Sequence, residues 1–168
     1  MIAKIALIIS IFSFLLTALK YFLDWKQHRL NLEVSVEQFC VVAHQHNFEI
    51  NIVNKTSTPV SVIRASLILK NKSELHVFNR SVTMGSDVKN NDKRFYFSTP
   101  LPIKLDSYDA KKVFFVINQT IPIEEIDYFK IYTNKGICIS KKTRYKEIEV
   151  TPIDLLKSVK NRWIDCLS

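Results

Sequence analysis

An apolar segment at the N-terminus constrains this chain more than any other feature. The run from Ile5 to Leu19 has 15 residues and no charged side chain, and Lys4 and Lys20 bracket it. A helix needs about 20 apolar residues to cross a bilayer core of about 30 Å, and lysines at its ends can extend their ammonium groups to the headgroups. The sequence therefore predicts a transmembrane anchor over residues 1–25.

The residues expected at the membrane–water interface combine lysines with aromatic side chains, which are enriched at that depth. They are Lys4, Lys20, Tyr21, Phe22 and Trp25. Basic residues are more numerous on the C-terminal flank of the segment than on its N-terminal flank. By the positive-inside rule, we expect a single-pass protein of the cell membrane whose C-terminal domain is cytoplasmic rather than extracytoplasmic.

Two other interpretations of the N-terminal segment are a cleaved signal peptide and a core helix of a soluble fold. A signal peptide has a comparable apolar run, but no small-x-small cleavage triplet precedes Lys20. A soluble core helix is disfavoured, because Ser10, Ser13 and Thr17 are the only polar residues of a run that is otherwise apolar throughout. An uncleaved anchor fits the pattern best.

The rest of the chain is long enough for one domain. Of the 168 residues, about 140 follow the anchor, and the formal net charge of the chain is +8. The basic residues form short clusters at expected loops, which is typical of a solvated surface. No helix-turn-helix, RNP or zinc-finger pattern accompanies them, so we expect no nucleic-acid partner.

From Leu30 onward, apolar and polar residues alternate with the period of β-strands. Phe48, Ile50 and Ile52, for example, fall on one face, and the polar residues between them fall on the other. The expected strands are residues 30–37, 48–52, 60–70, 75–84, 94–98, 113–117, 129–133, 137–140 and 145–150, with a loop over 85–92. The sequence thus predicts an all-β domain over residues 26–150, an antiparallel immunoglobulin-like β-sandwich, with a jelly roll or small barrel as alternatives.

The tail, residues 151–168, is expected to form a C-terminal amphipathic helix. Thr151 suits the N-cap, Pro152 the first helical position and Asp154 the first turn. Its apolar half supplies the candidate docking or partner-binding residues, Leu156, Val159, Trp163 and Leu167. We expect this half to lie on the sandwich; a partner groove and the membrane surface are the alternatives.

Motifs of enzymes and metalloproteins are scarce. Only two glycines occur, which excludes the Gly-rich phosphate loops and the nucleophile elbow. His44 and His46 could begin a metal site with His76 or Cys40, but the HQHN segment is better interpreted as a polar hairpin. We therefore expect no metal, no cofactor and no small-molecule substrate.

Carboxylates and cysteines add no catalytic pattern. Glu124, Glu125 and Asp127 are expected in a solvated turn, without the divergent environments that acid–base catalysis needs. Cys40 and Cys138 are expected to be buried thiols, which could pair only if the domain faced outward. The inventory favours a protein that is not an enzyme.

In length and layout, one N-terminal anchor followed by one small β-domain, the chain resembles many uncharacterised bacterial and phage-encoded membrane proteins. Some prophage superinfection-exclusion proteins share this layout, which transfers no functional residues. We expect a non-enzymatic, membrane-anchored interaction module that contacts the lipid bilayer and a protein partner at the membrane. The alternatives are a phage- or prophage-encoded envelope defence factor and a small hydrolase with an unrecognised site.

Overall fold

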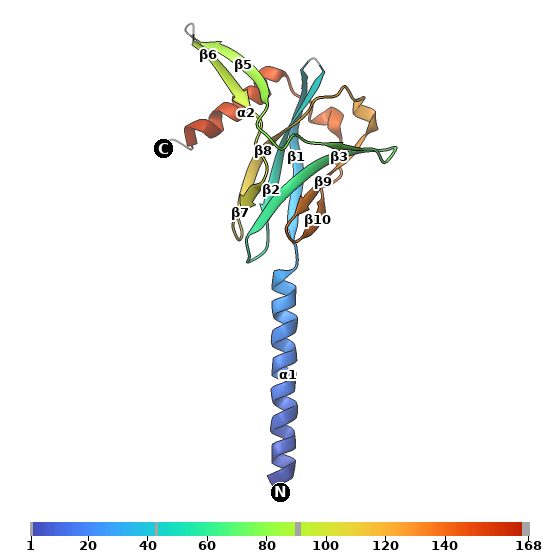
Figure 1. Ribbon diagram of the computed structural model, residues 1–168, viewed down its shortest axis with the longest axis vertical. Helices are drawn as coiled ribbons and strands as arrows, with labels where there is room; N and C mark the ends of the chain where they lie inside the picture. Colours follow the sequence, from blue (N-terminus) through green and yellow to red (C-terminus); the bar gives the residue numbers. More distant parts are fainter. Residues whose placement is uncertain (1, 43, 90–91, 166–168) are drawn as a thin grey trace.

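A long N-terminal helix projects from a β-domain that carries a second helix near the C-terminus (Figure 1). The computed structural model describes residues 2–42, 44–89 and 92–165. The helices are α1 (Ile2–His28) and α2 (Pro152–Asp165), and two short 3-10 turns are η1 (Ile123–Glu125) and η2 (Tyr145–Glu147). The strands are β1 (Leu32–Val42), β2 (Gln45–Asn54), β3 (Val60–Leu69), β4 (Glu74–His76), β5 (Thr83–Lys89), β6 (Asp92–Phe97), β7 (Ile103–Leu105), β8 (Ala110–Ile117), β9 (Ile126–Thr133) and β10 (Gly136–Ile139).

The strands form two main antiparallel sheets and a separate hairpin. One sheet has the order β1-β2-β8, and the other has the order β10-β9-β3-β4 with β7 also paired to β3. The hairpin consists of β5 and β6. The prediction of an all-β, antiparallel fold is therefore confirmed at the level of fold class.

Both main sheets contribute to one apolar core. Phe48 on β2 and Phe129 on β9 are fully buried, and their ring centroids lie 4.9 Å apart in an edge-to-face arrangement. Ile50 and Ile52 are buried in the same cluster. The alternation seen in residues 47–52 thus correctly identified the core face of β2, and each fully buried side chain of this size contributes about 1.5–3 kcal/mol.

A second, smaller cluster lies on the opposite face of the β1-β2-β8 sheet. Leu155 and Val159 of α2 pack there with Met84 and Tyr96 of the hairpin and with Phe114 of β8. In Figure 1, α2 and the β5–β6 hairpin lie together beside this sheet. Both faces of β2 are consequently covered, so the polar residues Asn47 and Glu49 are buried as well.

Large apolar side chains of α1 are exposed along the helix, with exposed fractions between 47% and 72%. Within the described part of the chain, no helix satisfies the length and apolarity required to span a membrane. The transmembrane assignment of residues 1–25 is therefore not supported by the structure, although one continuous helix does cover this segment. The uncharged run of 15 residues is shorter than the about 20 that a bilayer core requires.

Two expected segments differ from the structure. Residues 85–89 and 92, within the segment expected as a loop, belong to strands β5 and β6. Packing against α2 explains the glycine at position 85, because a Cβ there would lie 3.2 Å from Cδ1 of Leu156. Residues 145–150, expected as a strand, instead form η2 and a single parallel bridge between Glu149 and Phe39.

Candidate functional site

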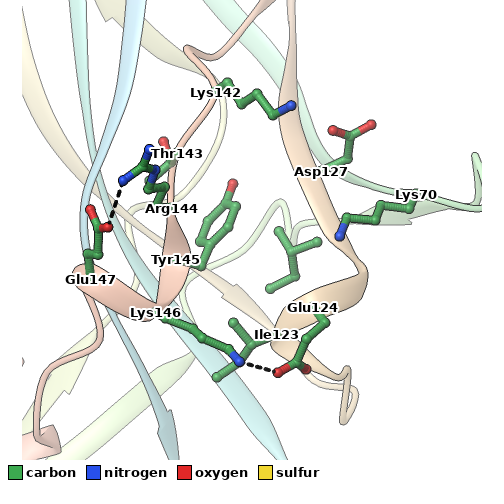
Figure 2. Close-up of a pocket in the computed structure, with 11 residues that line it drawn as sticks. Lys70, Ile123, Glu124, Asp127, Lys142, Thr143, Arg144, Tyr145, Lys146 and Glu147 are labelled. Atoms are coloured by element: carbon green, nitrogen blue, oxygen red, sulfur yellow. Dashed lines mark hydrogen bonds and ion pairs between the residues drawn. The ribbon is translucent and has the colours of Figure 1, made fainter.

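A cleft of about 430 Å³ lies where η1 and η2 approach the adjoining ends of β3 and β9. Its walls are Lys70, Ile123, Glu124, Ile126, Asp127, Lys142, Thr143, Arg144, Tyr145, Lys146 and Glu147 (Figure 2). In Figure 1 these turns, coloured orange and orange-red, lie at the end of the β-domain that is remote from α1. The volume falls within the range typical of small-ligand sites.

Two ion pairs occupy the lower and outer walls of the cleft, as Figure 2 shows. Nζ of Lys146 lies 2.9 Å from Oε1 of Glu124, and an Arg144 nitrogen, Nη1, lies 3.1 Å from Oε1 of Glu147. The hydrogen bond from Lys146 lowers the pKa of Glu124, and the same bond raises the pKa of Lys146. These four charges largely compensate one another.

Two further lysines on the rim are not compensated in this way. Lys70 and Lys142 are exposed, and within the described residues neither has a carboxylate within ion-pair distance. Asp127, which also lines the cleft, has its carboxylate 3.7 Å from Nζ of Lys72. Figure 2 shows Lys70 and Lys142 on the β3 and upper sides of the cleft. The local excess of charge is therefore positive.

Tyr145 forms the inner wall of the cleft, and 4% of its surface is exposed. Its ring meets Phe39 edge-on, with centroids 6.0 Å apart, so the core holds it in place. Its hydroxyl has no hydrogen-bond partner among the described residues. A buried polar group without a partner costs about 1–3 kcal/mol, which makes this hydroxyl an exception that calls for an explanation.

The hydroxyl of Tyr145 is a neutral hydrogen-bond donor. Burial, and secondarily the negative charge of Asp127, raises the pKa of this phenol far above its usual value. A phenolate nucleophile is consequently disfavoured, whereas donation to an acceptor is retained. The cleft can therefore bind an acceptor group by charge and hydrogen bonding.

The histidines singled out in the sequence lie in different environments. His46 is buried, and its Nδ1 donates to the carbonyl oxygen of Gln119 at 2.9 Å. His44 is exposed beside Thr120, and His76 lies on β4, with Nδ1 3.0 Å from Oγ of Ser66. Across residues 2–42, 44–89 and 92–165, no three metal-binding side chains gather into a site.

The cysteines are free thiols in two separate places. Cys40 is buried in the cluster beneath α2, and Cys138 is half-buried, with its Sγ 3.2 Å from the carbonyl oxygen of Leu32. Burial raises the pKa of both thiols. Cys166 lies outside the described residues. Neither described thiol has the lowered pKa of a reactive cysteine.

Of the predicted membrane-interface residues, Lys20, Tyr21, Phe22 and Trp25 lie in the domain-proximal half of α1, and Lys4 lies near its N-terminal end. Tyr21, Phe22 and Trp25 expose between 57% and 71% of their surfaces, and Lys20 is exposed. Arg29 lies over the Trp25 ring, with Cζ 5.8 Å from the centroid. The side chain of Lys4 lies outside the described part of the molecule.

The predicted docking residues of α2 are described in part. Val159 is buried and Leu156 is half-buried, and both pack in the cluster on the β1-β2-β8 sheet. The side chain of Trp163 and the whole of Leu167 lie outside the described residues. Leu155, which is more deeply buried than either neighbour, belongs to the same apolar half of the helix.

The cleft was missed by the sequence reasoning. Glu124, Glu125 and Asp127 were expected in a solvated turn, and η1 is indeed a short turn of this kind. The turn nevertheless faces η2, which was expected to be a strand. One signal in the sequence could have indicated the cleft. Tyr145 is the only large aromatic residue in the basic run from Lys141 to Lys146, and an aromatic ring has a large area to bury.

Comparisons with known proteins do not assign this chain to a family. No family model and no curated protein matches this chain. The chain is similar to a crystal structure of GH20 exo β-N-acetylglucosaminidase from Vibrio harveyi in complex with N-acetylglucosamine, with a TM-score of 0.32 and 8% identity. The match covers 71% of this chain and 18% of that chain, so the chain spans less than a fifth of its length. At this TM-score the likeness carries no argument.

Proposed function

We propose that this protein is a non-enzymatic binding module that α1 holds at a lipid bilayer. The observation that carries the proposal is the surface of α1. Ile11, Phe12, Phe14, Leu15 and Leu16 are all more than half exposed, and at 100° per residue they cover more than half of the helix circumference. The remaining face carries the small polar residues Ser10, Ser13 and Thr17. An exposed apolar surface of this width is costly in water and is stabilised in an apolar environment, which a lipid bilayer supplies.

The charges beside this surface suit a bilayer. Lys20 follows the apolar run, and its stem can lie along apolar surface while its ammonium group reaches the headgroups. Such snorkelling lengthens the segment that lipid can accommodate beyond the 15 uncharged residues. Tyr21, Phe22 and Trp25 then lie at the depth preferred by aromatic rings.

We further propose that the two main sheets form an immunoglobulin-like β-sandwich and that its partner binds at the η1–η2 cleft. The shared core of the two sheets supports the first statement, and the uncompensated Lys70 and Lys142 support the second. Because the cleft lies at the end remote from α1, a partner in the aqueous phase can reach it (Figure 1).

Flotation of the full chain with phosphatidylcholine–phosphatidylglycerol vesicles tests the role of α1. The protein is expected to float with the vesicles and to remain bound in high salt and in carbonate. The double variant Phe14→Asp, Leu15→Asp should stay in the dense fractions. Ile153→Asp is the matched control, because Ile153 is an exposed apolar residue of α2, and it should float like the parent. Recovery of the unmodified chain in the dense fractions would refute the proposal.

For orientation, we propose that the β-domain faces the cytoplasm, because basic residues are concentrated between Lys20 and Arg29. In that compartment Cys40 and Cys138 remain reduced. A membrane-impermeant protease added to intact cells should leave the domain uncut, whereas permeabilised cells should lose it. Digestion in intact cells would place the domain on the outer side.

A further inference from the structure

We propose that the η1–η2 cleft binds an oxyanion, the carboxylate or phosphate group of a small organic acid, between Lys70, Lys142 and the hydroxyl of Tyr145. This assignment rests on the binding role proposed for the cleft and is independent of where α1 lies. Three features of the cleft support this assignment: an unpaired hydrogen-bond donor, an excess of positive charge, and an apolar wall.

The donor is the hydroxyl of Tyr145. The side chain is buried, its phenol is neutral, and the hydroxyl has no partner in the described part of the chain. Figure 2 shows the hydroxyl directed toward the part of the cleft beneath Lys142. Native structures leave few buried donors unpaired, and a ligand acceptor would satisfy this one. Since the hydroxyl is shielded from bulk water, a neighbouring side chain must move as the ligand enters.

The balance of charge selects an anion. Glu124 and Glu147 are each paired with a cation of the cleft, and Asp127 is next to Lys72. The ammonium groups of Lys70 and Lys142 have no carboxylate within ion-pair distance among the described residues, although the charge of Lys70 also acts on Glu124. A carboxylate or phosphate accepts charge-assisted hydrogen bonds from such groups, which are roughly twice as strong as neutral ones. A cationic ligand would meet the same two ammonium groups and be repelled.

The apolar wall limits the rest of the ligand. Ile126 is buried and Ile123 is half-buried along the β9 side of the cleft. A cavity of about 430 Å³ holds a small organic molecule whose polar end is fixed by a few groups. A short aliphatic acid would thus place its oxyanion near Tyr145 and its carbon chain against the isoleucines.

The test is a titration of the full chain in detergent micelles at constant ionic strength. The probes are inorganic phosphate, glutarate, the uncharged glutaramide and, as a non-specific anion, chloride. The readouts are the melting temperature and the dissociation constant. Saturable binding of phosphate or glutarate, with no response to glutaramide, is expected. Stronger binding of glutarate would identify a carboxylate ligand, and stronger binding of phosphate a phosphorylated one. Equal responses to both anions and to chloride would overturn the proposal.

Variants locate the binding in the cleft. Lys142→Ala and Lys70→Ala should each weaken binding about tenfold, because a charge-assisted contact is lost. Lys157→Ala, at an exposed position of α2, should leave the dissociation constant unchanged. Binding that survives in the Lys70→Ala, Lys142→Ala double variant would overturn the assignment.

Tyr145→Phe distinguishes a ligand contact from a structural role. Without ligand it should melt at the same or a higher temperature than the parent, since it removes an unsatisfied buried hydroxyl. With ligand it should bind several-fold more weakly. Tyr132→Phe is the matched control, because the Tyr132 hydroxyl donates to Glu74 at 2.6 Å; it should melt lower and bind normally. A lower melting temperature and unchanged affinity for Tyr145→Phe would refute the proposal. Vesicle binding with no anion response would refute this assignment and leave the role of α1 intact.

Discussion

The hydroxyl of Ser158 on α2 donates a hydrogen bond of 2.6 Å to Oε2 of Glu49, at the centre of the β1-β2-β8 sheet. Glu49 is 1% exposed, and its other oxygen, Oε1, accepts a hydrogen bond of 3.1 Å from Nζ of Lys112. A buried carboxylate is costly unless it is paired and hydrogen-bonded, so these two partners make its position tolerable. The contact also fixes α2 on the sheet.

Ser158→Ala should therefore lower the free energy of unfolding by about 1–3 kcal/mol, because one oxygen of a buried carboxylate loses its donor. Lys157→Ala, on the neighbouring exposed position, should change it by about 0.5 kcal/mol or less. Urea unfolding of both variants, followed by far-UV circular dichroism, measures the difference. Equal stabilities would mean that α2 does not hold Glu49 in solution.

The apolar packing of α2 on the sheet predicts how two of its residues affect stability. Leu155 is 1% exposed and Ile153, two residues earlier, is 66% exposed. Leu155→Ala should cost about 2–5 kcal/mol, the usual range for a buried leucine, and Ile153→Ala should cost far less. Thermal melts of the two variants compare directly. If both melt like the parent, the apolar half of α2 is free to serve a partner instead.

The polar face of β2 shows what local sequence does and does not determine. Alternation correctly placed Phe48 and Ile50 in the core, because a strand orients successive side chains to opposite faces. The same alternation implied that Asn47 and Glu49 face water, yet both are buried under α2. That covering involves a segment more than 100 positions away, which no local pattern encodes.

The candidate site could not be predicted from the sequence for a similar reason. It joins Lys70, Glu124 and Tyr145, which come from three segments that only the completed fold brings together. Lys142 and Lys70 resemble ordinary surface lysines in the sequence. Their significance depends on the unpaired Tyr145 hydroxyl between them, and hydrogen-bond satisfaction is a property of tertiary structure.

Asn54, at the end of the β-domain next to α1, should be among the least tolerant polar positions. Its amide nitrogen donates to the carbonyl oxygens of Thr58 and Asp106 at 3.0 and 2.7 Å, and its Oδ1 accepts from the Thr56 hydroxyl at 2.6 Å. Asn54→Ala removes all of these bonds and leaves the buried backbone N–H of Thr56, which also donates to Oδ1, without its acceptor, at about 1–3 kcal/mol. Chemical denaturation should show the loss, and the exposed Asn118→Ala should leave the midpoint unchanged.

His46 should make stability fall at mildly acidic pH. Burial lowers its pKa, and this outweighs the opposing hydrogen bonds with the backbone of Gln119 and Ile121 and the charge of Glu149. Below about pH 6.5 the unfolded chain binds a proton that the folded chain does not, so the stability decreases as the pH falls, by at most about 1.4 kcal/mol per pH unit for one site.

The interval from pH 6.5 to 5 isolates this effect from the carboxylates. The pKa of Glu33, for example, is lowered to about 2, chiefly by hydrogen bonds from Lys141 and Lys55, so its own contribution is lost only as the pH falls well below that interval. Urea unfolding across the interval should give a steeper loss of stability for the parent than for His46→Gln. The exposed His44→Gln should keep the slope of the parent. Parallel slopes for all three proteins would show that His46 protonates equally in the folded and unfolded states.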